Sequence, residues 1–199
     1  LPIFKAIIVN PEGGKNQPLV DEAAFRDASK RFAKALAEHP ITSKGLAEYG
    51  TAVLVNILHE AGGLPTANFT VGRFDKHEAV SGELLNQVTK ERGGTVAHGC
   101  MSGCMIRCSG ILPDKKGKFQ SKWPEYETLW AFGPHSGIGD LDAISQYDYL
   151  CDDIGVDTID VGVAMGVAMA GGGIPYGDAK AVLAAMHAIS EGTPLGRVI

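Results

Sequence analysis

The sequence predicts a mainly α-helical fold, a multihelical, bundle-like domain with one short strand at its N-terminus. Apolar residues recur at helical spacing along most of the chain, and residues typical of helix starts and stops bracket those stretches. Apolar residues make up 45% of the 199 residues and charged ones 21%, which is typical of a globular chain with a sizeable core. We therefore expect residues 1–199 to form a single helical domain.

The elements follow in order along the chain. Residues 1–9 form an apolar run typical of a strand. Asp21 is a good N-cap for a helix that runs to about Glu38, where Pro40 follows. Further helices are expected at about 51–61, 77–92, 125–132, 140–154, 158–170 and 178–190, with a lysine-rich hairpin or loop at 113–122. Residues 195–199 resemble the start of another helix, and the chain does not begin with Met, so we expect a piece of a larger polypeptide.

The charge balance argues against nucleic acid as a partner, because 18 basic and 23 acidic residues give a net charge of −5 without a basic stripe. The longest apolar stretch, residues 161–174, is short for a membrane span and rich in glycine, so it predicts a buried helix with its exit loop rather than a membrane segment. Clustered cysteines without a signal peptide predict a reducing, cytoplasmic location.

Three closely spaced cysteines, Cys100, Cys104 and Cys108, are the most informative feature of the sequence. On an unbroken helix, residues four apart rise about 6 Å, so the first and third sulfurs would lie roughly 12 Å apart, too far for one metal centre. The segment must therefore curl around its ligand, and the glycines in and beside it permit this.

The cysteine spacing leaves three interpretations open. Zinc sites usually have two close pairs of ligands, and no second pair follows here. Three thiolates with a fourth ligand from elsewhere suit an iron–sulfur cluster better. The third interpretation is buried thiols without a ligand. Cys151 lies in an apolar helical stretch, where a structural role is expected.

Two glutamates flank a tyrosine in Glu125-Tyr126-Glu127, where we expect a helix to start. Their carboxylates either stabilise the helix dipole, or one of them faces a buried site, where desolvation raises its pKa and lets it transfer a proton. Residues two apart point about 200° from each other on a helix, so at most one of the two can face a given site.

A group of aspartates surrounds Gly155 at the junction of two predicted helices. In one interpretation Asp157 simply caps the second helix. In the other, Asp152 and Asp157 accept hydrogen bonds from the amino groups of a heterocycle. Asp160, in the following helix, is open to the same two interpretations.

Five short motifs stand along the chain: GLPTANF at 63–69, the cysteine triplet, EYET at 125–128, FGP at 132–134 and DxxGVDT at 152–158. In this order they resemble the aldehyde ferredoxin oxidoreductase family, and the resemblance extends from residue 6 to residue 197. The chain is similar to the second, middle domain of that three-domain enzyme. The flanking N- and C-terminal domains are therefore expected to lie outside this chain, which alone would be incomplete and inactive.

The resemblance implies an enzyme of anaerobes that oxidises aldehydes to carboxylic acids at a tungsten or molybdenum centre held by two pterins (tungstopterin or molybdopterin). Electrons would leave through a 4Fe-4S cluster to ferredoxin, and the enzyme could be a homodimer. By this resemblance Cys100, Cys104 and Cys108 hold the cluster, and Glu127 assists proton transfer or water activation near the metal. The residues implied to bind the pterin are Asp152, Gly155, Val156 and Asp157.

The chain departs from the family pattern at several positions. The cysteine spacing is C-x3-C-x3-C instead of C-x2-C-x3-C, Val156 replaces a leucine, and Ala67 stands where arginine is frequent. Some members bind a bridging iron through an E-x-x-H pair, and this chain offers Gln146 and Tyr149 there, which predicts no such iron. An alternative function is a helical iron–sulfur or zinc module that only transfers electrons or stabilises a fold.

Overall fold

The computed structural model describes residues 7–14 and 17–199, and the chain divides into two compact units, 1–35 and 36–199. Helix α1 (Glu22–Glu38) begins in the first unit. Asp21 caps this helix as predicted, because its Oδ1 accepts a hydrogen bond from the N–H of Ala24 at 2.9 Å. The first six residues of the predicted N-terminal strand lie outside the described residues, and 7–9 form no strand.

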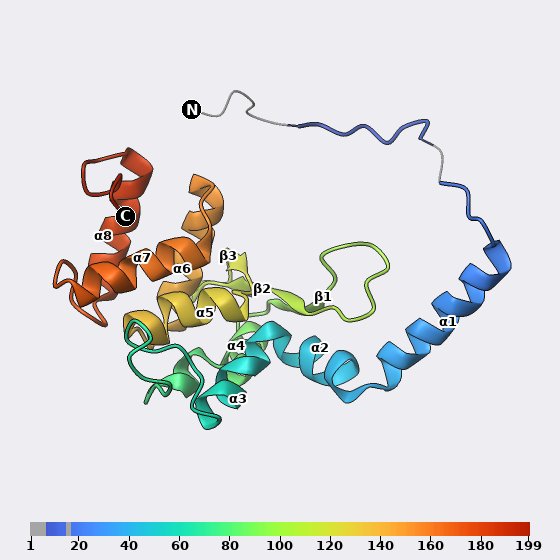
Figure 1. The fold of residues 1–199 in the computed structure, drawn as a ribbon, viewed down its shortest axis with the longest axis horizontal. Helices are drawn as coiled ribbons and strands as arrows, with labels where there is room; N and C mark the ends of the chain where they lie inside the picture. The colour runs from blue at the N-terminus through green and yellow to red at the C-terminus, as the bar shows by residue number, and fades with distance from the viewer. Residues whose placement is uncertain (1–6, 15–16) are drawn as a thin grey trace. The chain divides into compact units, whose positions relative to one another are not determined.

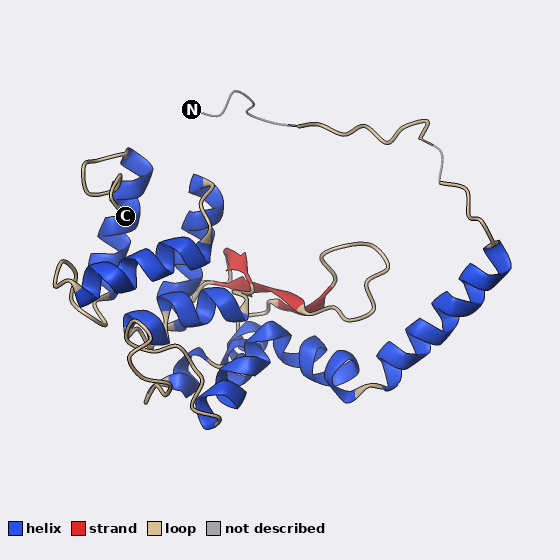
Figure 2. Ribbon diagram, in the orientation of Figure 1, coloured by secondary structure: helices blue, strands red, loops and turns tan. Residues whose placement is uncertain are grey.

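The second unit is built mainly from helices, as the sequence predicted (Figures 1 and 2). Short turns of π-helix or 3-10 helix precede several of them, at Ile41–Gly45, Gly50–Val53, His77–Val80 and Pro134–Ser136. The α-helices are α2 (Leu46–Tyr49), α3 (Leu54–Glu60), α4 (Gly82–Glu91), α5 (Tyr126–Phe132), α6 (Leu141–Ile154), α7 (Thr158–Ala170) and α8 (Ala179–Glu191). No helix among the described residues combines the length and the apolar character that crossing a bilayer requires.

A small antiparallel sheet lies between α4 and α5 in the chain, in the order β1 (Thr95–His98), β2 (Ser109–Pro113) and β3 (Phe119–Lys122). Strands β2 and β3 form a hairpin, with Leu112 opposite Ser121. The sequence predicted a hairpin or loop at 113–122, and the hairpin begins four residues earlier, at Ser109. Strand β1 was not predicted, because four residues are too few to show an alternating pattern. The sheet packs against α4 and α6, so its strand ends are held by helices.

Helix α7 approaches α5 and the Pro134–Ser136 turn closely through two glycines. An added Cβ on Gly162 would come within 2.6 Å of the Cβ of Ala131, and one on Gly166 within 2.0 Å of the His135 ring. These glycines lie one helical turn apart and so share a face. The glycine-rich apolar stretch is thus a buried helix, as predicted.

Gly162→Ala is expected to destabilise the chain by about 1–3 kcal/mol, because its methyl group would overpack the contact with Ala131. The control is Gly171→Ala at the end of α7, where the added Cβ would meet its nearest atom at 3.5 Å. That change is expected to stay within about 0.5 kcal/mol of the parent chain. Urea unfolding measures both, and equal midpoints for the two variants would contradict the packing argument.

Candidate metal and cofactor site

The three cysteines lie on the loop that joins β1 to β2, and this segment curls as predicted (Figure 1). Left-handed backbone at Gly103 (φ 81°) and Arg107 (φ 54°) turns the chain on either side of Cys104. The Cys104 N–H donates to the carbonyl of Met101 at 3.3 Å. The loop borders a cavity of about 630 Å³, with His98, Cys104 and Arg107 in its wall.

The three thiols are free and differ in their surroundings. Cys100 is exposed, whereas Cys104 and Cys108 are half-buried. Backbone N–H groups of Arg107 and Ile106 lower the pKa of the Cys104 thiol. Burial raises the pKa of Cys108, and the charge on a nearby glutamate adds to this rise. Because the thiolate is the metal-binding form, Cys104 is the better prepared ligand, and a bound cation would favour the thiolate of Cys108.

The donor set fits the chemistry of an iron–sulfur cluster. In residues 7–14 and 17–199, no three His, Cys, Asp or Glu side chains converge closely enough for a metal ion. Zinc holds its sulfur ligands at about 2.3 Å, and a cluster several Å across spaces its thiolates more widely. Three free thiols on one loop match the ligand type of such a cluster, with a fourth ligand from elsewhere. The ligand assignment stays a prediction.

The two glutamates of the EYET motif have different surroundings at the start of α5. Glu125 is half-buried, and its Oε2 accepts a hydrogen bond from Thr51 Oγ1 at 2.6 Å. Thr51 Oγ1 in turn accepts from the N–H of Tyr126 at 2.8 Å. Burial, with the charge of Glu127, raises the pKa of Tyr126 to about 12. Glu127 itself is exposed, so among the described residues it faces no buried site.

The DxxGVD motif forms the corner between α6 and α7. Gly155 ends α6 with a left-handed backbone (φ 84°), and an added Cβ there would meet no atom within 4 Å. Asp157 caps α7, because its Oδ1 accepts from the N–H groups of Ile159 and Asp160 at 2.8 and 3.0 Å. Asp152 is exposed, whereas Val156 packs against the core. The corner therefore presents an open backbone surface beside two carboxylates.

An ion-pair network contacts this corner through Asp152 and Thr158. The Lys122 ammonium, at the end of β3, lies 3.0 and 3.1 Å from the two carboxylate oxygens of Asp148 and 2.8 Å from Oδ2 of Asp152. Asp148 is buried on α6, and the hydroxyl of Thr128 on α5 donates to it at 3.5 Å. Thr128 also hydrogen-bonds Thr158, in the first turn of α7, at 2.9 Å. The network thus joins four elements.

Burial and the ion pairs act against each other in this network. Desolvation raises the pKa of Asp148 to about 6, although Lys122 opposes the rise. Burial alone would lower the pKa of Lys122, but its hydrogen bonds and charge interactions with Asp152 and Asp148 raise it overall. Desolvation also raises the pKa of Cys151 to about 12. Cys151 is therefore a buried neutral thiol, in keeping with the structural role expected for it.

The GLPTANF segment docks onto the FGP turn, so two motifs of the sequence meet in the structure. Ala67, Asn68 and Phe69 all have positive φ angles, of 45°, 51° and 61°. The N–H groups of Ala67 and Asn68 donate to the carbonyls of Pro134 and His135, each at 3.1 Å. The Phe69 ring packs edge-on against the His135 ring, with centroids 4.8 Å apart.

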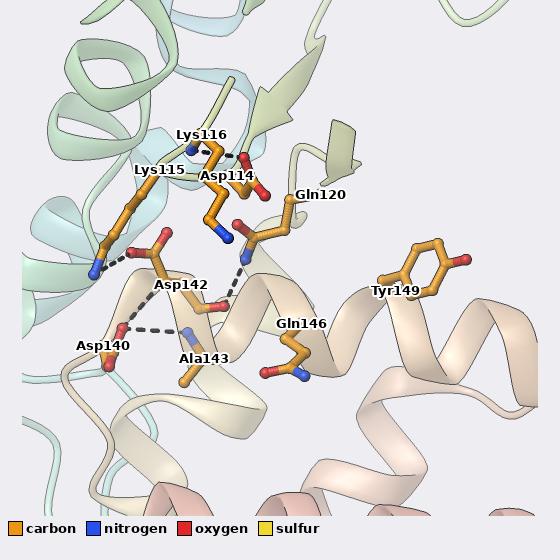
Figure 3. A pocket seen from close by; sticks show the side chains of 9 residues that line it. All are labelled: Asp114, Lys115, Lys116, Gln120, Asp140, Asp142, Ala143, Gln146 and Tyr149. Carbon is orange, nitrogen blue, oxygen red and sulfur yellow. Dashed lines mark hydrogen bonds and ion pairs between the residues drawn. The ribbon is translucent and has the colours of Figure 1, made fainter. Parts of the chain in front are cut away.

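A separate cavity of about 560 Å³ lies between the β2–β3 turn and α6 (Figure 3). Gln146 and Tyr149 line it, where some relatives are expected to carry metal ligands. Lys115 and Gln120 contact Asp142 across it, at 3.3 Å to the carboxylate and 2.8 Å to the carbonyl. An amide and a phenol do not replace a Glu-His pair, so the absence of a bridging iron remains a prediction.

Residues 27–199 match the family described as aldehyde ferredoxin oxidoreductase, domains 2 & 3. The chain belongs to the aldehyde ferredoxin oxidoreductase family. The tungsten-containing aldehyde ferredoxin oxidoreductase of Thermococcus kodakarensis is 36% identical to it over 166 residues, and that of Pyrococcus furiosus 35%. Each of these alignments covers 83% of the chain and 26% of the relative. The chain thus spans about a quarter of the length of the curated relatives it matches.

Within this member of the aldehyde ferredoxin oxidoreductase family, sequence reasoning missed two charged residues beside the predicted pterin motif. Asp148 lies four residues before Asp152, a spacing that places both carboxylates on one face of α6. This spacing was the available signal for Asp148. Lys122 is distant from both aspartates in the sequence, and only the folding of the hairpin onto α6 brings it to them. The structure joins Asp152 to this pair but leaves Glu127 exposed and outside it.

The Asp148→Asn change is expected to alter the pH dependence of stability. The pKa of Asp148 is about 6 in the folded chain against a usual 3.8, so the folded chain holds more protons between these values. The contribution of Asp148 to the free energy of unfolding is present below about pH 4 and declines as the pH rises through 6. Urea titrations from pH 4 to 7 measure the slope, which should become more positive in the variant. Identical slopes would contradict the raised pKa.

Proposed function

We propose that this chain is part of an enzyme that oxidises aldehydes to carboxylic acids at a tungsten or molybdenum bis-pterin centre. Membership of the aldehyde ferredoxin oxidoreductase family supports this proposal. The observation that carries it is the β1–β2 loop, whose three free cysteines have the ligand type of an iron–sulfur cluster. When bound, the pterin-held metal supplies the two-electron oxidation, and the 4Fe-4S cluster carries electrons toward ferredoxin.

The residues of the chain have distinct roles in this proposal. Cys100, Cys104 and Cys108 hold the cluster, and the backbone N–H groups of Arg107 and Ile106 lower the pKa of the Cys104 thiol. Glu127 moves a proton at its carboxylate near the metal. Its exposure in the first turn of α5 leaves the carboxylate accessible to a group supplied by another part of the enzyme.

The α6–α7 corner is the proposed contact with the pterin. The Asp152 carboxylate is an acceptor for the amino group of the heterocycle. Gly155 leaves its backbone uncovered, so that a ligand can approach it, and Val156 anchors the corner in the core. Asp157 holds the start of α7 with one carboxylate oxygen and orients the corner.

Several further features belong to the proposed enzyme. We propose that residues 1–199 form the second domain of a longer enzyme, whose N- and C-terminal domains complete the cofactor site. The enzyme acts in the cytoplasm of an anaerobe and can form a homodimer. It passes its electrons to ferredoxin or a similar acceptor. The chain alone is expected to be inactive.

Cys104→Ser in the full-length enzyme is expected to abolish the cluster signal, because a serine oxygen replaces one of three thiolates. Cys151→Ser is the matched control, since this buried thiol belongs to the core. Anaerobic purification with iron, tungsten and molybdenum analysis and absorption spectra measures both. Full iron content in Cys104→Ser contradicts the ligand assignment. Iron or zinc without pterin in the parent enzyme supports the alternative of a metal-binding module.

Glu127→Gln is expected to lower turnover by about 10²–10⁴-fold with little change in cofactor content, because it removes a group that transfers a proton. Glu125→Gln is the control two residues away and should have a mild effect, since an amide oxygen can still accept the Thr51 hydroxyl. Steady-state rates with an aldehyde and a reducible dye provide the comparison. Near-native rates for both variants would remove Glu127 from the mechanism.

A further inference from the structure

Lys122 joins a buried carboxylate to an exposed one. Its ammonium contacts both oxygens of Asp148 and Oδ2 of Asp152, at 3.1, 3.0 and 2.8 Å. We propose that Lys122 is a positioning residue that is anchored on Asp148 and holds the Asp152 carboxylate in the orientation that binds the pterin. The inference deepens the proposed function and rests on its assignment of Asp152.

The anchor is fixed because Asp148 cannot move into solvent. Its side chain is 1% exposed, compared with 61% for Asp152. An ammonium has three N–H donors, and three carboxylate oxygens surround the one on Lys122. Thr128 holds the same Asp148 carboxylate from α5. The direction of the Lys122 side chain is therefore set by buried contacts rather than by the exposed carboxylate it reaches.

The consequence for Asp152 is a defined orientation at an exposed position. An unpaired aspartate in the last turn of a helix samples several rotamers, and ordering it on binding costs conformational entropy. The Lys122 contact engages Oδ2, and Oδ1 takes no part in the ion pair. The fixed orientation prepares the carboxylate for the N–H donors of a heterocycle.

A second ion pair on α6 shows what a purely structural role would look like. Arg92, at the end of α4, contacts Asp142 in the first turn of α6 through both terminal nitrogens. It ties one element to α6, as Lys122 does, but its partner lies outside the DxxGVD motif. Arg92→Gln is therefore the matched control for the loss of an ion pair that holds α6.

The test uses the full-length enzyme isolated with its cofactors. Pterin retained per chain after dilution and gel filtration is measured together with the midpoint of thermal unfolding. The variants are Lys122→Gln, Lys122→Arg, Asp152→Asn, the double change of Lys122→Gln with Asp152→Asn, and Arg92→Gln. Lys122→Gln combined with Asp148→Asn removes the ion pair without leaving a buried charge, so folding does not limit the comparison.

Lys122→Gln is expected to weaken pterin retention about tenfold, as for other partners of ligand-contacting groups. Lys122→Arg should retain pterin as the parent enzyme does. In a chain that already carries Asp152→Asn, the further change Lys122→Gln should cause no additional loss of pterin. The inference would be overturned if Lys122→Gln retained as much pterin as Arg92→Gln. It would also be overturned if the loss in the double variant equalled the product of the losses in Lys122→Gln and Asp152→Asn. Unchanged retention in Asp152→Asn alone would instead refute the pterin contact of the proposed function, and the inference with it.

Discussion

A carboxylate stays ionised in a protein interior only when a partner compensates its lost hydration, and Asp148 imposes this constraint on the second unit. Lys122 supplies the charge from β3, and Thr128 supplies a hydroxyl from α5. Thr158 extends the network to the start of α7. The hairpin and three helices must therefore keep their relative positions within this unit. The corner that carries the DxxGVD motif is built on this fixed frame.

The other candidate residues lie where helices and strands end. The cysteine loop leaves β1 and returns on β2, and the EYET motif begins α5. Backbone groups are unpaired at such ends, so they can hydrogen-bond a side chain or a ligand. Within the cysteine loop, the backbone N–H groups of Arg107 and Ile106 lower the pKa of the Cys104 thiol. Rigid elements thus hold irregular segments, which is the usual arrangement for binding loops.

Much of the fold could be predicted because it depends on local signals. Asp21 and Asp157 cap helices as the sequence indicated, since each side chain reaches an N–H only two or three residues away. Strand β1 and the short turns before α2 and α3 were missed. Elements of four or five residues carry too little periodicity, and packing against their neighbours decides their structure.

The sequence by itself determined the helices, the curled cysteine segment and membership of the family, because each depends on residue types at fixed spacing. Only the tertiary structure decided that Lys122 meets Asp152, that Glu127 is exposed and that Glu125 is partly buried. Contacts between residues tens of positions apart depend on how the helices pack. Packing responds to the shape and volume of many side chains at once, which no short motif records.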